Sequence, residues 1–302
     1  MGLTRFPHGV SSFGIPVVGN RYAGPWATHY FVDGVNGSDS NSGLDPSKAL
    51  STIDAAVQKC TVGDVVYIRP KAYVVGTGHA RYEGAITVDL EQSDISLIGT
   101  GYPKNSEFGV RFKTTAGYGC TINAPSTHME NIGWFVSAGD GSVKWASNGA
   151  TSTTRGSDGP TIYNCHFKGG TDYMQGGQSA AFHNCRFHYD TGSLIIADSG
   201  ASSYGLQIRD CNFLDNNGAA PTGPYIQWGG AHAYNVWIDH CRFGRTPTNG
   251  YINMGGTLGT GIISGCYVSQ GDVTLNTAFP GATNNTLIFF TGNYDATNNI
   301  IA

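Results

Sequence analysis

The sequence predicts a single right-handed parallel β-helix, and three observations predict that fold. A six-residue motif built around cysteine recurs five times in the second half of the chain. The copies are unequally spaced, as expected when the coils of a solenoid keep their strands in register and vary their loops. Charged residues are only 13% of the 302, against about 25% in an average domain, and glycine supplies 44. This composition favours many short strands joined by tight corners.

The repeated motif contains an apolar residue, a turn-forming residue in third place, a cysteine and a second apolar residue. These apolar residues cannot all face the core of one regular strand, because successive side chains alternate between its two faces. A bend at the third position, where Asn, Asp, His or Gly stands, would turn all of them inward, since Asn, Asp and Gly tolerate a left-handed conformation. The copies are residues 162–167, 182–187, 208–213, 238–243 and 263–268, with a degenerate sixth copy at 290–294.

Stacked coils would place one cysteine of each copy in a single buried column, with neighbouring strands about 4.8 Å apart. We predict that these thiols are reduced and act as small apolar fillers, because a zinc site needs ligands that converge tetrahedrally. No metal and no cofactor is therefore predicted. From residue 65 onward, coils of about 25 residues would give roughly nine coils and a rod about 45 Å long. The predicted structural ladder is Cys165, Cys185, Cys211, Cys241 and Cys266.

The chain divides into three predicted parts: an extended arm (1–28), a cap with an amphipathic helix (29–64) and the parallel β-helix (65–302). The arm holds three prolines and five glycines and shows no helical or strand periodicity. Its apolar residues need a surface to lie on, either a neighbouring subunit or the arm's own domain. For the first alternative, the partner-binding residues would be Leu3, Arg5, Phe6, Phe13 and Ile15.

In the cap, Ser51 and Asp54 have the spacing of a capping box that begins a helix ending near Cys60. The loop before this helix is rich in oxygen ligands, which favours either a Ca²⁺ site or ordinary Asx turns. Its polar residues are Asp33, Asn36, Asp39, Asn41 and Asp45.

Residues 30–73, YFVDGVNGSDSNSGLDPSKALSTIDAAVQKCTVGDVVYIRPKAY, resemble the N-terminal cap of pectate-lyase-like β-helix proteins. In that superfamily the amphipathic helix plugs the open end of the β-helix, and the strand after Gly-Asp begins the first coil. The resemblance implies the fold but not the activity, because lyases, hydrolases, adhesins and phage spikes share this cap.

A second resemblance concerns chemistry. The stretch VWIDH at 236–240 is similar to one in pectate lyases, and Arg245 with Pro247 resembles the start of their RxPxxR motif, whose first Arg is the catalytic base. The second Arg of that motif would fall at Gly250. A glycosidase would need two carboxylates on one face, and Asp210 and Asp239 could be neighbours on successive coils, unless both are turn residues. If the chain is an enzyme, the predicted catalytic residues are Asp210, Asp239, His240 and Arg245.

Several features bear on partners. The net charge of −4 argues against nucleic acid as a partner, and no apolar run is long enough for a membrane span. An odd number of cysteines without an export signal at the start predicts assembly in a reducing cytoplasm. Aromatic residues between the motif copies could bind a glycan, or pack in loops and between subunits: Tyr173, Tyr189, Tyr204, Tyr225, Trp228 and Tyr234.

The opening TRFPHGVSSFG at residues 4–14 resembles the openings of phage particle proteins. Together with the scarcity of acidic residues after residue 131, this favours a non-enzymatic virion structural protein of a tailed bacteriophage. Such a protein would decorate the head or attach to the tail, assemble in the host cytoplasm as a homotrimer and bind other virion proteins through its arm. The alternative is a polysaccharide-degrading lyase or hydrolase of the tailspike type.

Overall fold

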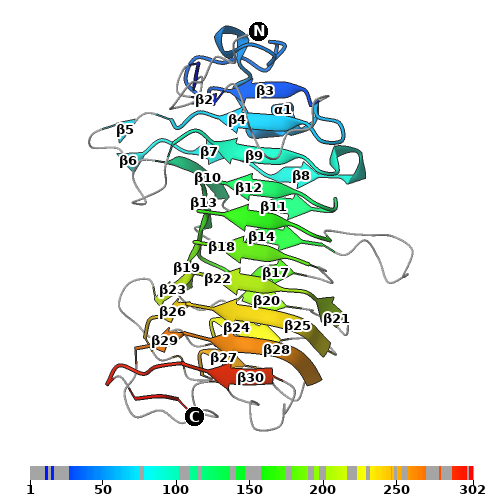
Figure 1. Ribbon diagram of the computed structural model, residues 1–302. Helices are drawn as coiled ribbons and strands as arrows, with labels where there is room; N and C mark the ends of the chain where they lie inside the picture. The colour runs from blue at the N-terminus through cyan, green and yellow to red at the C-terminus, as the bar shows by residue number, and fades with distance from the viewer. Residues whose placement is uncertain are drawn as a thin grey trace, which may run out of the picture.

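The protein is a right-handed parallel β-helix, described here from a computed structural model (Figure 1). Strands stack from β3 near the N-terminus to β30 near the C-terminus and form three parallel sheets, which each coil visits in turn. No helix in the described part of the chain is long and apolar enough to cross a membrane. The structure describes residues 11–12, 15–16, 27–71, 73–74, 78–101, 109–114, 117–136, 141–146, 158–174, 179–189, 194–196, 202–215, 223–228, 232–245, 247, 250–253, 258–269, 279, 288–297 and 299–301.

Sheet 1 holds the first half of every motif copy and runs the length of the rod. Nine of its strands, from β4 to β30, follow one another coil by coil in the described residues, in agreement with the predicted nine coils. The strands are β3 (His29–Val32), β4 (Val65–Ile68), β9 (Ser96–Gly99), β12 (His128–Glu130), β15 (Thr161–Tyr163), β18 (Ala181–His183), β22 (Gln207–Arg209), β25 (His232–Asp239), β28 (Leu258–Ser264) and β30 (Ile288–Thr291), with β21 (Ser202–Tyr204) beside β25.

Sheets 2 and 3 complete each coil. Sheet 2 contains β7 (Tyr82–Glu83), β10 (Val110–Thr114), β13 (Ile132–Val136), β16 (His166–Lys168), β19 (Arg186–Tyr189), β23 (Asn212–Asp215), β26 (Arg242–Phe243) and β29 (Tyr267–Val268). Sheet 3 contains β8 (Ile86–Val88), β11 (Tyr118–Ile122), β14 (Gly141–Trp145), β17 (Asp172–Met174), β20 (Leu194–Ile196), β24 (Ile226–Trp228) and β27 (Ile252–Asn253). Two short antiparallel pairs lie outside the sheets: β1 (Ser11–Ser12) with β2 (Ile15–Pro16), and β5 (Tyr73–Val74) with β6 (Gly78–His79).

The predicted left-handed bend joins sheet 1 to sheet 2 in every motif copy. The residue in third place has a positive φ of 50° to 61° in all five copies, and in the sixth copy Gly292 has a φ of 60°. The N–H of each bend residue donates to a carbonyl of the next coil, as from Asn184 to the Arg209 oxygen at 3.0 Å. The bend is therefore held by the stack as well as by residue type. The five residues are Asn164, Asn184, Asp210, His240 and Gly265.

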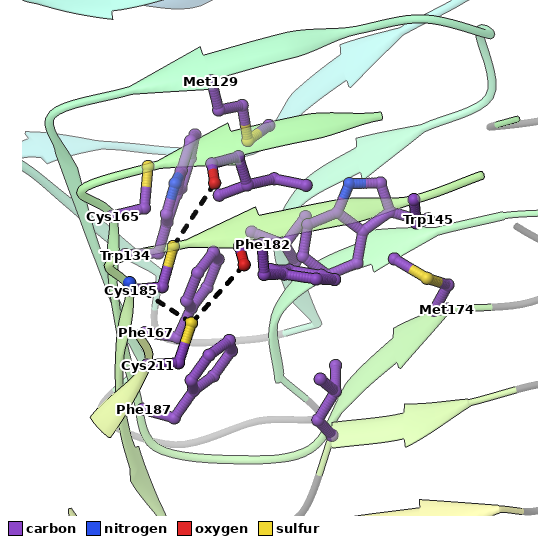
Figure 2. Close-up of a cluster of buried hydrophobic side chains, with 14 of the residues drawn as sticks. Met129, Trp134, Trp145, Cys165, Phe167, Met174, Phe182, Cys185, Phe187 and Cys211 are labelled. Carbon is purple, nitrogen blue, oxygen red and sulfur yellow. Dashed lines mark hydrogen bonds between the residues drawn. The ribbon is translucent and has the colours of Figure 1, made fainter. Parts of the chain in front are cut away.

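All seven cysteines are free and buried, among them the five of the predicted ladder. Figure 2 shows Cys165, Cys185 and Cys211 stacked beside the aromatic core. The Cys185 thiol donates to the Ile162 carbonyl of the preceding coil at 3.6 Å. Burial first, and then neighbouring thiols, raise the pKa of Cys165 and Cys211 well above the ordinary value, so these thiols stay neutral.

The sixth motif copy is also confirmed, with an amide in place of the thiol. The Asn293 side chain is fully buried and donates to the Ile263 carbonyl at 3.0 Å, while its oxygen accepts the N–H of Cys266 at 3.0 Å. Asn293 thus satisfies the backbone at the C-terminal end of the ladder.

A column of aromatic rings lies next to the thiols. Phe167, Phe187, Phe213 and Phe243 stack nearly parallel on successive coils, with ring centroids 4.6 to 5.0 Å apart. These rings are fully buried, and burying one such side chain stabilises a fold by about 1.5–3 kcal/mol.

The cap helix α1 (Ile53–Val57) is shorter than predicted, and its N-cap is Thr52 rather than Ser51. The Thr52 hydroxyl accepts the N–H of Ala55 at 3.2 Å. The Asp39 carboxylate accepts the N–H groups of Ser51 and Thr52, which fixes this cap one residue later than the sequence pattern suggested. Ile53, Ala56 and Val57 on its apolar face are buried in the core. Short 3-10 turns occur at η1 (Pro46–Lys48) and η2 (Leu90–Gln92).

We predict that Phe213→Ala lowers the free energy of unfolding by about 3–5 kcal/mol, because it opens a cavity within the ring column. Phe289→Ala, whose ring is 70% exposed, should change it by less than about 0.5 kcal/mol. Urea unfolding followed by circular dichroism measures both values. Equal effects of the two substitutions would contradict the assigned ring column.

Candidate functional site

The outer side of sheet 1 carries a column of exposed apolar side chains near the C-terminal end of the rod. Trp237, Ile262 and Phe289 pair in register on β25, β28 and β30. They are 40%, 43% and 70% exposed, although most large apolar side chains of a folded protein are covered. We call these three residues the apolar column. Contiguous exposed apolar surface of this kind marks interaction sites.

A polar cluster borders the apolar column, formed by Arg209 on β22, Asp239 on β25, His240 at the following bend and Ser264 on β28. The Asp239 carboxylate lies at its centre. Its Oδ1 accepts the Ser264 hydroxyl at 2.6 Å, and its Oδ2 lies 2.8 Å from His240 Nδ1 and 3.8 Å from Arg209 Nη2. The Arg209 guanidinium also lies 4.3 Å above the centre of the Trp237 ring, so it joins the cluster to the apolar column.

The cluster is built to keep Asp239 ionised. Burial alone would raise the pKa of this carboxyl, but hydrogen bonds from Ser264 and His240 and the charge of Arg209 lower it below the ordinary value. The hydrogen bond to Asp239 and its charge in turn raise the pKa of His240, an exposed side chain. Asp239 and His240 therefore form a charge-assisted pair at the edge of the apolar column.

The structure brings together only part of the predicted catalytic set. Asp210 and Asp239 do lie on successive coils, since the Asp210 N–H donates to the Asp239 carbonyl at 3.0 Å. Asp210 is a bend residue, in agreement with the alternative that these aspartates are turn residues. Asp239 lies within β25 and is not a turn residue. The cluster forms without Arg245, which follows β26 beyond the bend and whose carbonyl accepts the Tyr225 hydroxyl at 3.1 Å.

The order of contacts argues against nucleophilic catalysis. In a Ser–His–Asp triad the histidine lies between the other two residues and takes the proton of the serine. Here Asp239 lies between His240 and Ser264, so the serine hydroxyl donates to a carboxylate that remains ionised. Asp239 is the carboxylate that makes these contacts, and the charge of Asp210 on the neighbouring coil also contributes to the raised pKa of His240.

Among the aromatic residues proposed for glycan binding, two are placed differently from the expectation. Tyr225 is fully buried and Trp228 is 3% exposed, because both face the core from the sheet 3 segment around β24. Tyr204 is 43% exposed and stacks on Tyr234 at 5.1 Å beside the apolar column's strand β25. The side chains of Tyr173 and Tyr189 lie outside the described residues.

Sequence reasoning missed Trp237, Ile262 and Phe289, and a signal for them was present. Each directly precedes the first apolar residue of a motif copy. Because that apolar residue faces inward and strand side chains alternate, the residue before it must face outward. A large apolar residue there in three successive copies indicates an exposed column.

The oxygen-rich cap loop is built of Asx turns and similar local hydrogen bonds. Asp33 accepts the N–H groups of Val35 and Asn36, and Asp45 accepts that of Ser47. No group of three or more His, Cys, Asp or Glu residues that could hold a metal ion occurs in the described ranges. Of the predicted arm contacts, Leu3, Arg5, Phe6 and Phe13 lie outside those ranges, and Ile15 belongs to β2.

We predict that an NMR titration of His240 gives a pKa above the ordinary 6.5, and that Asp239→Asn removes this increase. A raised pKa stabilises the fold at low pH, so the contribution of His240 is lost as the pH rises through its folded pKa. The lowered pKa of Asp239 makes its own contribution disappear as the pH falls below 3.8.

The matched control is Asp45→Asn at the opposite end of the rod, which should leave His240 unchanged. An unaltered His240 titration in Asp239→Asn would show that the pair is not formed in solution.

No protein-family model and no curated protein matches the sequence. Among solved structures, the pectin methylesterase from Aspergillus niger superimposes with a TM-score of 0.54 at 14% identity, over 92% of this chain and 89% of that chain. Its deglycosylated form gives 0.52 at 14% identity, over 91% and 87%. A rhamnogalacturonan lyase superimposes at 0.42 with 16% identity, over 89% and 74%. At 14% identity the likeness to the pectin methylesterase shows the fold alone, a right-handed parallel β-helix.

Proposed function

We propose that this chain is a non-enzymatic structural protein of a tailed-phage particle, and that its rod binds a glycan on the outer side of sheet 1. The observation that carries the binding role is the apolar column beside the polar cluster. Sugar rings present apolar C–H faces and a rim of hydroxyl groups. Exposed aromatic rings such as Trp237 and Phe289 complement those faces, and charged groups such as Arg209 and Asp239 complement hydroxyls.

The coil repeat supports a chain-like ligand that lies along the rod. The three residues of the apolar column are related by successive strand spacings of about 4.8 Å, close to the length of one sugar ring. The polar cluster runs parallel to the column, since Arg209, Asp239 and Ser264 are also register partners. A glycan strand would therefore meet an apolar contact and a polar contact at each coil.

The particle role rests on the sequence. The arm is rich in proline and glycine and yet contains many apolar residues, which suits anchoring to a neighbouring virion protein. The rod that follows contains free, buried thiols, which suits assembly in a reducing cytoplasm. A homotrimer, with the arm contacting either the head or the tail, is part of this proposal.

The alternative is an enzyme that acts on a polysaccharide, as the superimposed pectin methylesterase acts on pectin. The polar cluster favours this alternative because an imidazole and a hydroxyl both contact one carboxylate. Incubation with polyuronates and host capsular glycans should yield no new reducing ends or unsaturated products. Turnover that disappears in Asp239→Asn would replace the binding role with catalysis.

We predict that Trp237→Ala with Phe289→Ala weakens glycan binding about tenfold or more, because two stacking surfaces are lost. Binding is measured by isothermal titration against host surface glycans identified on an array. Leu44→Ala with Val62→Ala is the control, since these side chains are 56% and 61% exposed at the other end of the rod and should have no effect. Wild-type affinity in the Trp237 and Phe289 double variant would refute the site.

We predict that deletion of residues 1–20 abolishes incorporation into particles while leaving the β-helix folded. Cosedimentation of tagged protein with purified particles measures incorporation, and the circular dichroism spectrum reports the fold. Undiminished incorporation of the truncated chain would refute anchoring by the arm.

A further inference from the structure

Lysine and arginine are unevenly distributed among the three sheets. The described strands of these sheets hold seven such residues, and five of them belong to sheet 2. The other two are Lys144 on sheet 3 and Arg209 on sheet 1. We call the five on sheet 2 the basic face: Arg111, Lys113, Lys168, Arg186 and Arg242.

The basic face lies on the outer side of sheet 2, where Arg111 is only 6% exposed because it packs over the Phe135 ring, and the other four members are half-buried or exposed. Its members alternate along their strands with the buried ring column, so strand geometry directs them away from the core. Register pairing aligns Arg111, Arg186 and Arg242 in one column, and Lys113 and Lys168 in a second column two residues away, about 7 Å. Five strand spacings of about 4.8 Å separate β10 from β26, so the charges extend over about 24 Å.

Lys113 pairs in register with Glu83 on β7, whereas the described strands place no carboxylate in register beside Lys168, Arg186 or Arg242. In the part of the chain that the structure describes, no carboxylate lies within 4.0 Å of Lys113, Lys168, Arg186 or Arg242. Arg186 and Arg242 are exposed. In a chain of net charge −4, this leaves a local surface of opposite sign to the whole.

A buried histidine lies between the cations of the basic face, and their positive charges affect its pKa. His166 is 3% exposed, and its Nε2 lies 3.0 Å from His188 Nδ1. Burial first, and then the charges of His188, Arg186, Lys168 and Arg111, lower the pKa of His166 to about 2. The imidazole therefore stays neutral among its charged neighbours.

The rings on this face are covered by guanidinium groups. Arg111 lies 4.7 Å above the Phe135 ring, and Arg242 lies 5.5 Å from the centre of the Tyr267 ring. Phe135 is only 9% exposed. Bases of single-stranded nucleic acid need open aromatic platforms, which these rings do not offer. The N-terminal arm is not the complement either, because residues 1–28 contain no carboxylate.

We propose that the basic face binds a linear polysaccharide that carries sulfate or phosphate groups and lies along the rod. The two columns of cations would flank one narrow polymer chain over several coils. Since the face offers charge rather than stacking, a polymer with more than one charge per sugar gains most from it, and a polyuronate with one charge per sugar gains less. This surface is distinct from the apolar column and does not depend on it.

Heparin is the sulfated probe that tests the proposal, with binding measured by isothermal titration at several salt concentrations. Wild-type protein should bind with an affinity that falls linearly in a log–log plot against salt. Arg186→Glu with Arg242→Glu, both exposed, should weaken binding on the order of tenfold. Lys48→Glu with Lys59→Glu, exposed in the cap and identical in net charge change, should leave it within about twofold.

Trp237→Ala with Phe289→Ala should leave heparin binding unchanged, which separates this site from the apolar column. The proposal is overturned if wild-type protein does not bind heparin, or if both charge-reversal pairs weaken binding equally. It is also overturned if polygalacturonate, duplex DNA or anionic phospholipid vesicles bind more tightly than heparin through Arg186 and Arg242.

Discussion

The left-handed bend in third place of each motif copy is the constraint on which the rest of this molecule depends. An L-residue in that conformation is disfavoured by roughly 1–2 kcal/mol, and Asn, Asp and Gly reduce that cost. The neighbouring coil offsets it further, because each bend N–H donates to the next coil, as from Asp210 to the Asp239 carbonyl. Without the bend, a strand would turn toward water either the first apolar residue or both the cysteine and the second apolar residue.

The same bend determines what the rod presents outside. In the fourth copy, Ile238, Cys241 and Phe243 point inward, so Trp237 and Asp239 must face outward before the bend and Arg242 after it. One short segment thus contributes to the apolar column, the polar cluster and the basic face. Because the coils stack, each kind of outward side chain recurs along the axis of the rod. The structural repeat therefore produces the apolar column and polar cluster on sheet 1 and the basic face on sheet 2, on either side of the bend.

The fold and its interior could be predicted from the sequence, because they follow from residue type within one motif copy. The bend at Asn184, the burial of Cys211 and the continuation of the ladder at Asn293 are all local consequences of the pattern. The cap was predicted less well, since Asp39 lies 13 residues from Thr52 and no local pattern shows that its carboxylate holds that N-cap.

The surfaces were harder to predict because they depend on which residues stack across coils of unequal length. Arg209 and Asp239 are 30 residues apart, and Lys113 and Lys168 are 55 apart, so neither pair is visible as a sequence motif. Net charge was misleading for the same reason: a total of −4 conceals five cations gathered on one sheet. Only the register in which the coils stack shows that these residues lie side by side.

The bend is tested most directly by comparing Asn184→Gly with Asn184→Ala in urea unfolding. Both substitutions remove the same side-chain contact with Asn164, so their difference isolates the backbone conformation at a φ of 53°. We expect the glycine variant to be more stable than the alanine variant by about 1 kcal/mol. An alanine variant as stable as the glycine variant, or more stable, would contradict this expectation.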